Sequence, residues 1–248
     1  MTATPARARH IGVIPARKGS KGVPGKNRYL FPALADFIVK NGFFDRVIVT
    51  TDDESLLQMA TARGFETRLR PDALAADSVS IKAAFVDVAE NCPVDGDEYL
   101  WLLFIPLVYR RAEHFRAAKD IVDARLPTSL CSFRSARTHP FACWRIDDKT
   151  GAVEHFVEND LFNRQDFPAA WENYNYLSCI RASDLADANA NLIRHDTYPF
   201  IMDAKMAANM VEIDEPADFQ LWRRAHPEDF DAWLRTLPDD CPLLPLKE

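Results

Sequence analysis

Short apolar runs alternate with amphipathic segments along most of the chain. Four runs have the length and continuous hydrophobicity of strands buried inside a parallel sheet, at residues 11–14, 46–50, 99–104 and 129–133. Between them, apolar positions recur at helical spacing, as at Ile81, Phe85 and Val88, and again from Phe115 to Val122. This alternation predicts a three-layer α/β fold, whose ligands bind at the carboxyl ends of the strands.

The chain after about residue 138 departs from this alternation. Residues 139–176 are rich in aromatic and charged side chains, and we expect strands and long loops beyond the sheet edge that cover a pocket or meet a second subunit. Further on, Phe219 and Trp222 mark one helix, and residues 230–237 mark a second with Pro227 in its first turn. We expect residues 1–9 to form a flexible arm, 10–237 a single domain and 238–248 an extended tail.

Composition narrows the possible functions. The 248 residues carry 30 Lys and Arg against 37 Asp and Glu, a formal charge of −7, which is a poor balance for binding nucleic acid. No apolar run approaches the roughly 18 residues of a membrane span. The five cysteines have no metal-ligand spacing, so we expect reduced thiols in the cytoplasm and no structural zinc.

One loop concentrates the chemistry. The chain has only eight glycines, yet three of them fall with three lysines directly after the first predicted strand: Lys18, Gly19, Lys21, Gly22, Gly25 and Lys26. The spacing fits neither a Walker A motif nor a dinucleotide fingerprint. Glycines nevertheless let backbone amides approach a polyphosphate, which Arg17, Lys21 and Lys26 would neutralise. The alternative is a solvated basic turn.

Residues 15–27 resemble the signature of the CMP-sialate synthetases, the cytidylyltransferases that activate sialic acid and related nonulosonic acids. That signature reads Pro-Ala-Arg-x-x-Ser-Lys-Gly-x-x-x-Lys-Asn, and every fixed position is present. Four further stretches resemble family elements in the same order, at residues 47–53, 70–80, 164–168 and 212–219. The resemblance spans about residues 10–225 and implies a Rossmann-like nucleotidyltransferase sheet, to which 139–176 adds an aromatic-rich strand and loop segment.

The resemblance also implies a reaction. The anomeric hydroxyl of a 2-keto sugar acid would attack the α-phosphate of CTP and expel pyrophosphate. Arg17 and Lys21 would be catalytic, and the implied nucleotide site consists of Arg17, Ser20, Lys21, Lys26, Asn27, Arg70 and Ser80. Phe104, Arg164 and Gln165 would lie at the acceptor. The family context likewise implies a cytoplasmic homodimer.

The same resemblance implies a magnesium site. Glu212 and Asp214 would hold Mg²⁺, because alternate residues of a strand face the same side and carboxylates are good ligands for this ion. Each of the matching stretches also has an ordinary structural explanation. Residues 51–54 read as a capping box, and Arg70 as a surface arginine.

The chain departs from the family mainly at the acceptor positions. The family's Leu-Gln-Pro-Thr-Ser-Pro-Leu-Arg reads Leu-Phe-Ile-Pro-Leu-Val-Tyr-Arg at 103–110, and Glu172 reverses the charge of a family arginine. These changes favour a deoxy, diacylamino nonulosonic acid over N-acetylneuraminate. The alternatives are a degenerate CTP- or CMP-binding protein that acts as a regulatory or partner subunit, and another nucleotide-dependent transferase.

Overall fold

A mostly parallel seven-stranded sheet organises the chain, and the computed structural model describes residues 8–19, 21–76, 79–238 and 241–243. The strand order is β3-β2-β1-β4-β8-β5-β9. The bounds are β1 (His10–Pro15), β2 (Arg46–Thr51), β3 (Glu66–Leu69), β4 (Tyr99–Leu102), β5 (Ser129–Ser135), β8 (Trp171–Arg181) and β9 (Tyr198–Ile201). All neighbours pair in parallel except β8, which is antiparallel to both β4 and β5.

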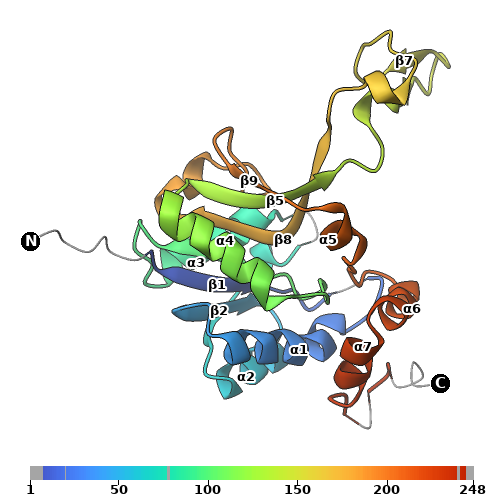
Figure 1. Ribbon diagram of the computed structural model, residues 1–248. Coiled ribbons are helices and arrows are strands. Elements are labelled where there is room, and N and C mark those ends of the chain that lie inside the picture. Colours follow the sequence, from blue (N-terminus) through green and yellow to red (C-terminus); the bar gives the residue numbers. More distant parts are fainter. Residues whose placement is uncertain (1–7, 20, 77–78, 239–240, 244–248) are drawn as a thin grey trace, which may run out of the picture.

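Helices cover both faces of this sheet, which confirms the predicted three layers (Figure 1). One face carries α1 (Lys26–Asn41), α2 (Glu54–Ala62) and α4 (Ala112–Arg125), and α6 (Pro216–Ala225) and α7 (Pro227–Leu234) share its apolar core. The other face carries α3 (Ile81–Asn91) and the 3₁₀ turn η4 (Ala182–Asp187). Alternation along β1 divides the two cores, since Ile14 packs in the first while Ile11 and Val13 pack in the second.

The four predicted strands are present in the seven-stranded sheet, and its strands β3 and β9 were not predicted. β3 has mostly exposed residues and therefore shows no apolar run. β8 was partly hidden in the irregular segment, and its antiparallel direction lets the chain return from the sheet edge without a crossover helix. Among the described helices, none is long and apolar enough to cross a membrane.

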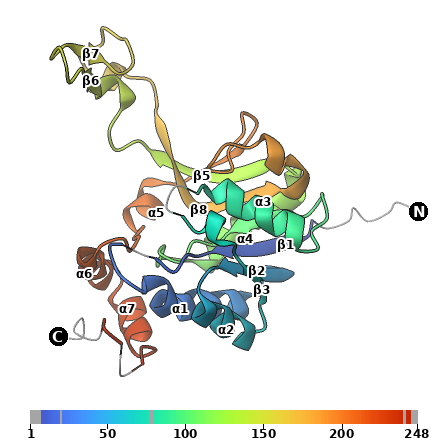
Figure 2. The same cartoon turned by 180° about the vertical axis from the view of Figure 1, so that it is seen from behind.

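Residues 139–176 contribute an arm and the first part of β8. The arm contains the turns η2 (Pro140–Ala142) and η3 (Arg164–Asp166) and the two-stranded hairpin of β6 (Trp144–Ile146) and β7 (Val153–His155). It projects away from the body in two opposite views (Figures 1 and 2). The arm therefore does not fold back over the body of its own chain, and the interpretation as a dimerisation segment stays a prediction.

The two ends are ordered where the structure describes them. Arg9 forms an ion pair with Glu98 at 3.0 Å, so the inner end of the N-terminal segment 1–9, which was predicted to be flexible, is tied to the body. Cys241 is buried and residues 242–243 form a turn, so the described part of the tail folds against the body instead of extending. The short elements η1 (Asp72–Leu74) and α5 (Ala204–Ala208) complete the fold.

Candidate active site

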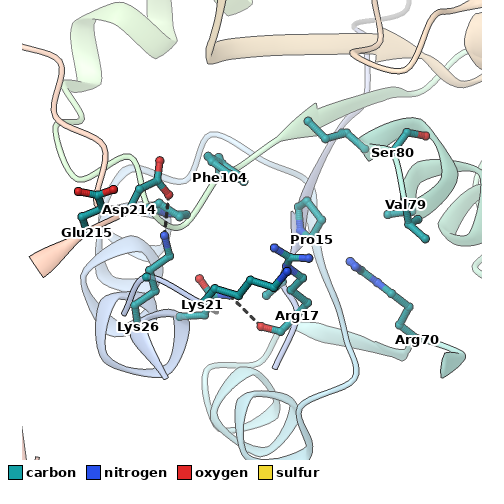
Figure 3. Close-up of a pocket in the computed structure, with 16 residues that line it drawn as sticks. Pro15, Arg17, Lys21, Lys26, Arg70, Val79, Ser80, Phe104, Asp214 and Glu215 are labelled. Atoms are coloured by element: carbon teal, nitrogen blue, oxygen red, sulfur yellow. Dashed lines mark hydrogen bonds and ion pairs between the residues drawn. The ribbon is translucent and has the colours of Figure 1, made fainter. Parts of the chain in front are cut away.

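A cavity of about 420 Å³ opens beside the carboxyl end of β1 (Figure 3). This is the edge where parallel α/β sheets bind ligands. The lining is provided by Pro15, Ala16, Arg17, Lys21, Gly22, Lys26, Asn27, Arg70, Val79, Ser80, Ile81, Ala84, Phe104, Pro106, Asp214 and Glu215. Six of the predicted nucleotide residues thus meet at one cavity, and the seventh, Ser20, lies outside the described residues.

The loop between β1 and α1 is fixed by hydrogen bonds at both ends. The backbone amide of Lys18 donates to the carboxylate of Asp52 at 2.7 Å, just after β2. The side-chain amide of Asn27 donates to the carbonyl of Arg17 at 3.0 Å. Asn27 therefore closes the loop as well as lining the cavity, and Asp52 fastens the loop to the neighbouring strand.

Two positions in this loop require glycine for structural reasons. A Cβ at Gly22 would lie 2.0 Å from the carbonyl oxygen of Asp214, so only glycine lets the loop approach that segment so closely. Gly25 adopts φ of 73°, the left-handed region, and is the N-cap of α1. The helix consequently begins at Lys26, whose amide donates to the carbonyl of Val23 at 3.2 Å. The positive end of the helix dipole lies beside the cavity, where it favours a phosphate.

Lys26 has two roles. Its ammonium donates to the carboxylate of Asp214 at 2.7 Å and to the carbonyl of Ile213 at 2.5 Å. An ammonium has three donors, so one proton remains for a phosphate. Lys26 therefore holds the 213–214 segment against α1 while it contributes positive charge to the cavity.

On the opposite wall of the cavity, the side chains of Arg70 and Ser80 both form hydrogen bonds with backbone groups. Arg70 is buried and donates to the carbonyl of Thr50 at 2.9 Å, which excludes the surface-arginine interpretation. Burial lowers the pKa of Arg70, and the carboxylate of Asp52 opposes this shift. The hydroxyl of Ser80 accepts from the amide of Ala83 at 3.2 Å as the N-cap of α3. Both positions are thus rigid.

The three predicted acceptor residues do not lie together in the structure. Phe104 lies in the wall of the first cavity (Figure 3), where it replaces a polar family residue with an aromatic ring. Arg164 and Gln165 lie in η3 on the exposed arm, and neither lines the cavity of its own chain. Their predicted contact with an acceptor therefore needs the arm of another copy.

The predicted metal pair is arranged differently from the sequence expectation. Glu212 forms an isolated bridge with Leu107 and no strand continues to Asp214, so the two carboxylates face different cavities. They still interact, because burial and then the charge of Asp214 raise the pKa of Glu212. Within the described residues no group of three or more potential ligands is found. The two carboxylates therefore do not form one site as arranged, but Asp214 alone suits Mg²⁺, which keeps several waters and takes phosphate oxygens as further ligands.

A second cavity of about 540 Å³ lies on the other side of the 212–218 segment. It is lined by Arg134, Arg137, Tyr174, Ala208, Met210, Val211, Glu212, Asp218, Leu221, Arg224 and Ala225. Sequence reasoning missed its arginines because they come from β5, the start of the arm and α6, which are distant in sequence. Glu215, beside Asp214 in the first cavity, was also missed.

Residues 51–54 have a structural role, although not as the predicted capping box. The N-cap of α2 is Asp53, which accepts from the amides of Ser55 and Leu56. The same carboxylate accepts from two nitrogens of the Arg28 guanidinium, Nε at 2.6 Å and Nη2 at 2.9 Å. Burial acts against ionisation, but the Arg28 hydrogen bond and charge outweigh it and lower the pKa of Asp53. Asp53 therefore ties α1 to α2.

A mostly parallel sheet with a cation-bearing loop and a helix N-terminus at the end of β1 is typical of α/β proteins that bind phosphate groups. The family model described as Cytidylyltransferase matches residues 11–236. The chain belongs to the cytidylyltransferase family.

Individual relatives agree with this assignment. The N-acylneuraminate cytidylyltransferase of Streptococcus agalactiae serotype III (strain NEM316) is 26% identical over 164 residues, which are 63% of this chain and 39% of that relative. The chain therefore corresponds to less than half of that longer protein. The CMP-N,N'-diacetyllegionaminic acid synthase of Legionella pneumophila is 26% identical over 86% of this chain and 94% of its own length.

A solved structure shares the fold. The structure of CMP:2-keto-3-deoxy-manno-octonic acid synthetase complexed with CTP superposes with a TM-score of 0.60 at 14% identity, and the match covers 90% of this chain and all of that one. At this identity the likeness establishes the nucleotidyltransferase fold alone.

Proposed function

We propose that this chain transfers the cytidylyl group of CTP to the anomeric hydroxyl of a 2-keto sugar acid and releases pyrophosphate. One observation carries the proposal. A single cavity brings the cations of Arg17, Lys21 and Lys26 together at the N-terminus of α1. Positive charge and the positive end of a helix dipole favour a triphosphate, and membership of the cytidylyltransferase family supports cytidine as its base.

The proposed chemistry requires positioning and charge neutralisation more than a covalent nucleophile. Arg17 and Lys21 hold the phosphates while the loop is fixed by Asp52 and Asn27. Of the predicted pair, Asp214 lines this cavity and would hold Mg²⁺, which when bound supplies charge neutralisation for the leaving pyrophosphate, whereas Glu212 lines the second cavity. Arg70 and Ser80 form the far wall, where the cytidine lies in this proposal.

The acceptor belongs to the same proposal. The Legionella relative is named for N,N'-diacetyllegionaminic acid, a deoxy sugar acid with two acylamino groups. Phe104 adds apolar surface to the cavity, which suits such groups better than additional hydroxyls. We therefore propose that an acceptor of the legionaminic or pseudaminic type is preferred over N-acetylneuraminate.

We further propose that the chain acts as a homodimer in the cytoplasm. The arm exposes large apolar side chains, including Phe162, Phe156 and Ile146, at 95%, 63% and 64% exposure. A second copy that covers them would also bring Arg164 and Gln165 to the partner's cavity. All five cysteines are free thiols, as suits a reducing compartment.

The experiment is a pyrophosphate-release assay with each of the four nucleoside triphosphates, Mg²⁺ and three sugar acids. N-acetylneuraminate, N,N'-diacetyllegionaminate and pseudaminate are the acceptors, and mass spectrometry identifies the product. We expect release with CTP and a CMP-sugar product, with the highest kcat/KM for a diacylamino acid. Tight CTP binding with no product from any acceptor would favour the alternative of a catalytically degenerate binding protein.

A further inference from the structure

The second cavity lies at the base of the arm, where β5 leaves the body and β8 returns. Its lining includes three arginines, Arg134, Arg137 and Arg224, together with the carboxylates of Glu212 and Asp218. The proposed nucleotide site uses none of these arginines. A cavity of about 540 Å³ has room for a ligand the size of a monosaccharide.

Arg134 is already oriented for a ligand. It lies opposite Glu172 in the β5–β8 pairing, and its Nε donates to the Glu172 carboxylate at 2.6 Å. The guanidinium also stacks over the ring of Tyr174, 4.3 Å from its centroid. Because the bond to Glu172 uses Nε, the terminal nitrogens can donate to a carboxylate as a fork. Because the Arg134 side chain is already held in place, binding a ligand costs it less conformational entropy.

The Arg134–Glu172 ion pair also explains why a glutamate is tolerated at position 172, where the family has an arginine. A bare glutamate at an acceptor site would repel a sugar acid. Here Arg134 neutralises Glu172 across the strands, and Arg137 adds a second cation three residues further along the chain. The presence of Glu212 and Asp218 in the same cavity makes it unsuitable for a polyphosphate but compatible with a single carboxylate.

The two cavities share one wall. The carboxylate of Asp218, in the second cavity, accepts from the backbone amides of Asp214 and Glu215 at 2.8 and 2.7 Å, and these two residues line the first. In a 2-keto sugar acid the carboxylate and the anomeric hydroxyl are borne by the same carbon. An acceptor that spans the two cavities at this wall would therefore place its carboxylate in the second cavity and its anomeric hydroxyl toward the triphosphate in the first.

We propose that Arg134 and Arg137 bind the carboxylate of the sugar-acid acceptor in the second cavity, and this inference rests on the proposed function. These arginines are then specificity-determining residues contributed by the same chain that binds the nucleotide. Tyr174 orients Arg134, and Arg224 closes the α6 side of the cavity.

The test compares the acid and the carboxamide forms of N,N'-diacetyllegionaminate as acceptors. The variants are Arg137→Ala and the double variant Arg134→Gln/Glu172→Gln, which leaves no unpaired charge. We expect about a tenfold or larger rise in acceptor KM for the acid in both, with an unchanged KM for CTP. The preference of the wild type for the acid over the carboxamide should largely disappear. Arg235→Ala, on the exposed end of α7, is the matched control.

An unchanged acid-to-carboxamide preference in both variants would overturn the inference, as would a loss confined to Arg164→Ala on the arm. Failure of the proposed function is a separate result, namely no pyrophosphate release by the wild type with any acceptor. In that case calorimetric titration of N-acetylneuraminate into the CTP-bound protein decides. Weaker binding by Arg137→Ala than by the wild type supports the carboxylate site, and equal or absent binding overturns it.

Discussion

At the residue scale, the contact between Gly22 and the Asp214 carbonyl joins the two sides of the nucleotide cavity. One side is the loop after β1, and the other is the segment before α6. A Cβ at Gly22 would meet the carbonyl oxygen at 2.0 Å, well inside any tolerable distance. The obstacle is backbone, so it cannot rotate away as a side chain would. The shape of the site therefore depends on one missing methyl group.

We predict that Gly22→Ala raises the Kd for CTP about tenfold or more, because the loop must move away from Asp214 and loses its preorganised position. It should also lower the free energy of unfolding by about 1–3 kcal/mol. Calorimetry and denaturant melts measure the two effects. Gly19→Ala is the control, since its added Cβ would meet nothing within 4 Å, and its stability should match the wild type. Equal losses in both variants would contradict this account.

A second prediction concerns Lys21. Its side chain lines the cavity, whereas that of the exposed neighbour Lys18 does not, although both come from the same loop. Replacing Lys21 with alanine should reduce kcat about 100-fold or more, because a cation beside developing phosphate charge stabilises the transition state by a few kcal/mol. Lys18→Ala should stay within about threefold of the wild type. Comparable kcat values for the two variants would mean that the loop is only structural.

At the element scale, the cavity depends on how α1 and α2 begin. Gly25 starts α1 beside the loop, and Asp53 starts α2 while pairing with Arg28 of α1. The carboxylate of Asp53 is almost fully buried, at 5% exposure. This pair therefore holds the two helices that follow β1 and β2 in a fixed relation below the site.

The Asp53–Arg28 pair predicts a pH dependence of stability. The folded-state pKa of Asp53 lies below its ordinary value of 3.8, so the contribution is fully present above about pH 4 and is lost as the pH falls through the folded pKa. Asp53→Asn keeps an N-cap but removes the charge. It should lower the free energy of unfolding by about 1–2 kcal/mol at pH 7, with a smaller difference at pH 3. Glu54→Gln, in the same helical turn, controls for general charge effects; a pH-independent difference would refute the assignment.

Much of this arrangement could be predicted from the sequence, and there are physical reasons why the remainder could not. Local signals gave β1, β2, the loop of Lys21 and the helix starting at Pro227, because each is written in neighbouring residues. β3 carries no apolar run, and Glu212 is paired with Leu107 only through the tertiary fold. The Arg134–Glu172 pair joins positions 38 residues apart, which no local pattern reveals.

At the scale of the whole molecule, the arm is the feature whose exposed apolar surface has no counterpart in the described body of the same chain to cover it. It connects the end of β5 to the start of β8 and projects far from the body (Figure 2). Its aromatic side chains include the exposed Phe156 and Phe162. Exposed apolar surface on this scale is typical of an interface. The proposed nucleotide site lies in the body, so the arm is available to contact another copy.

We predict that the double variant Phe156→Ser/Phe162→Ser shifts the protein from dimer to monomer, because it removes two large apolar contacts from the proposed interface. Light scattering after size-exclusion chromatography measures the mass. Val39→Ser is the control, since Val39 is 60% exposed but lies on α1 in the body. A wild type that is monomeric at all concentrations would contradict the homodimer.

The cavity between the β1–α1 loop and α3 is the proposed binding site of CTP for cytidylyl transfer. Calorimetric titration of CTP, UTP, ATP and GTP into the wild-type protein in the presence of Mg²⁺ tests this assignment. We predict that CTP binds about tenfold or more tightly than each of the others, and that Lys21→Ala weakens this binding. Equal affinity for all four nucleotides, or CTP binding that Lys21→Ala leaves unchanged, would contradict it.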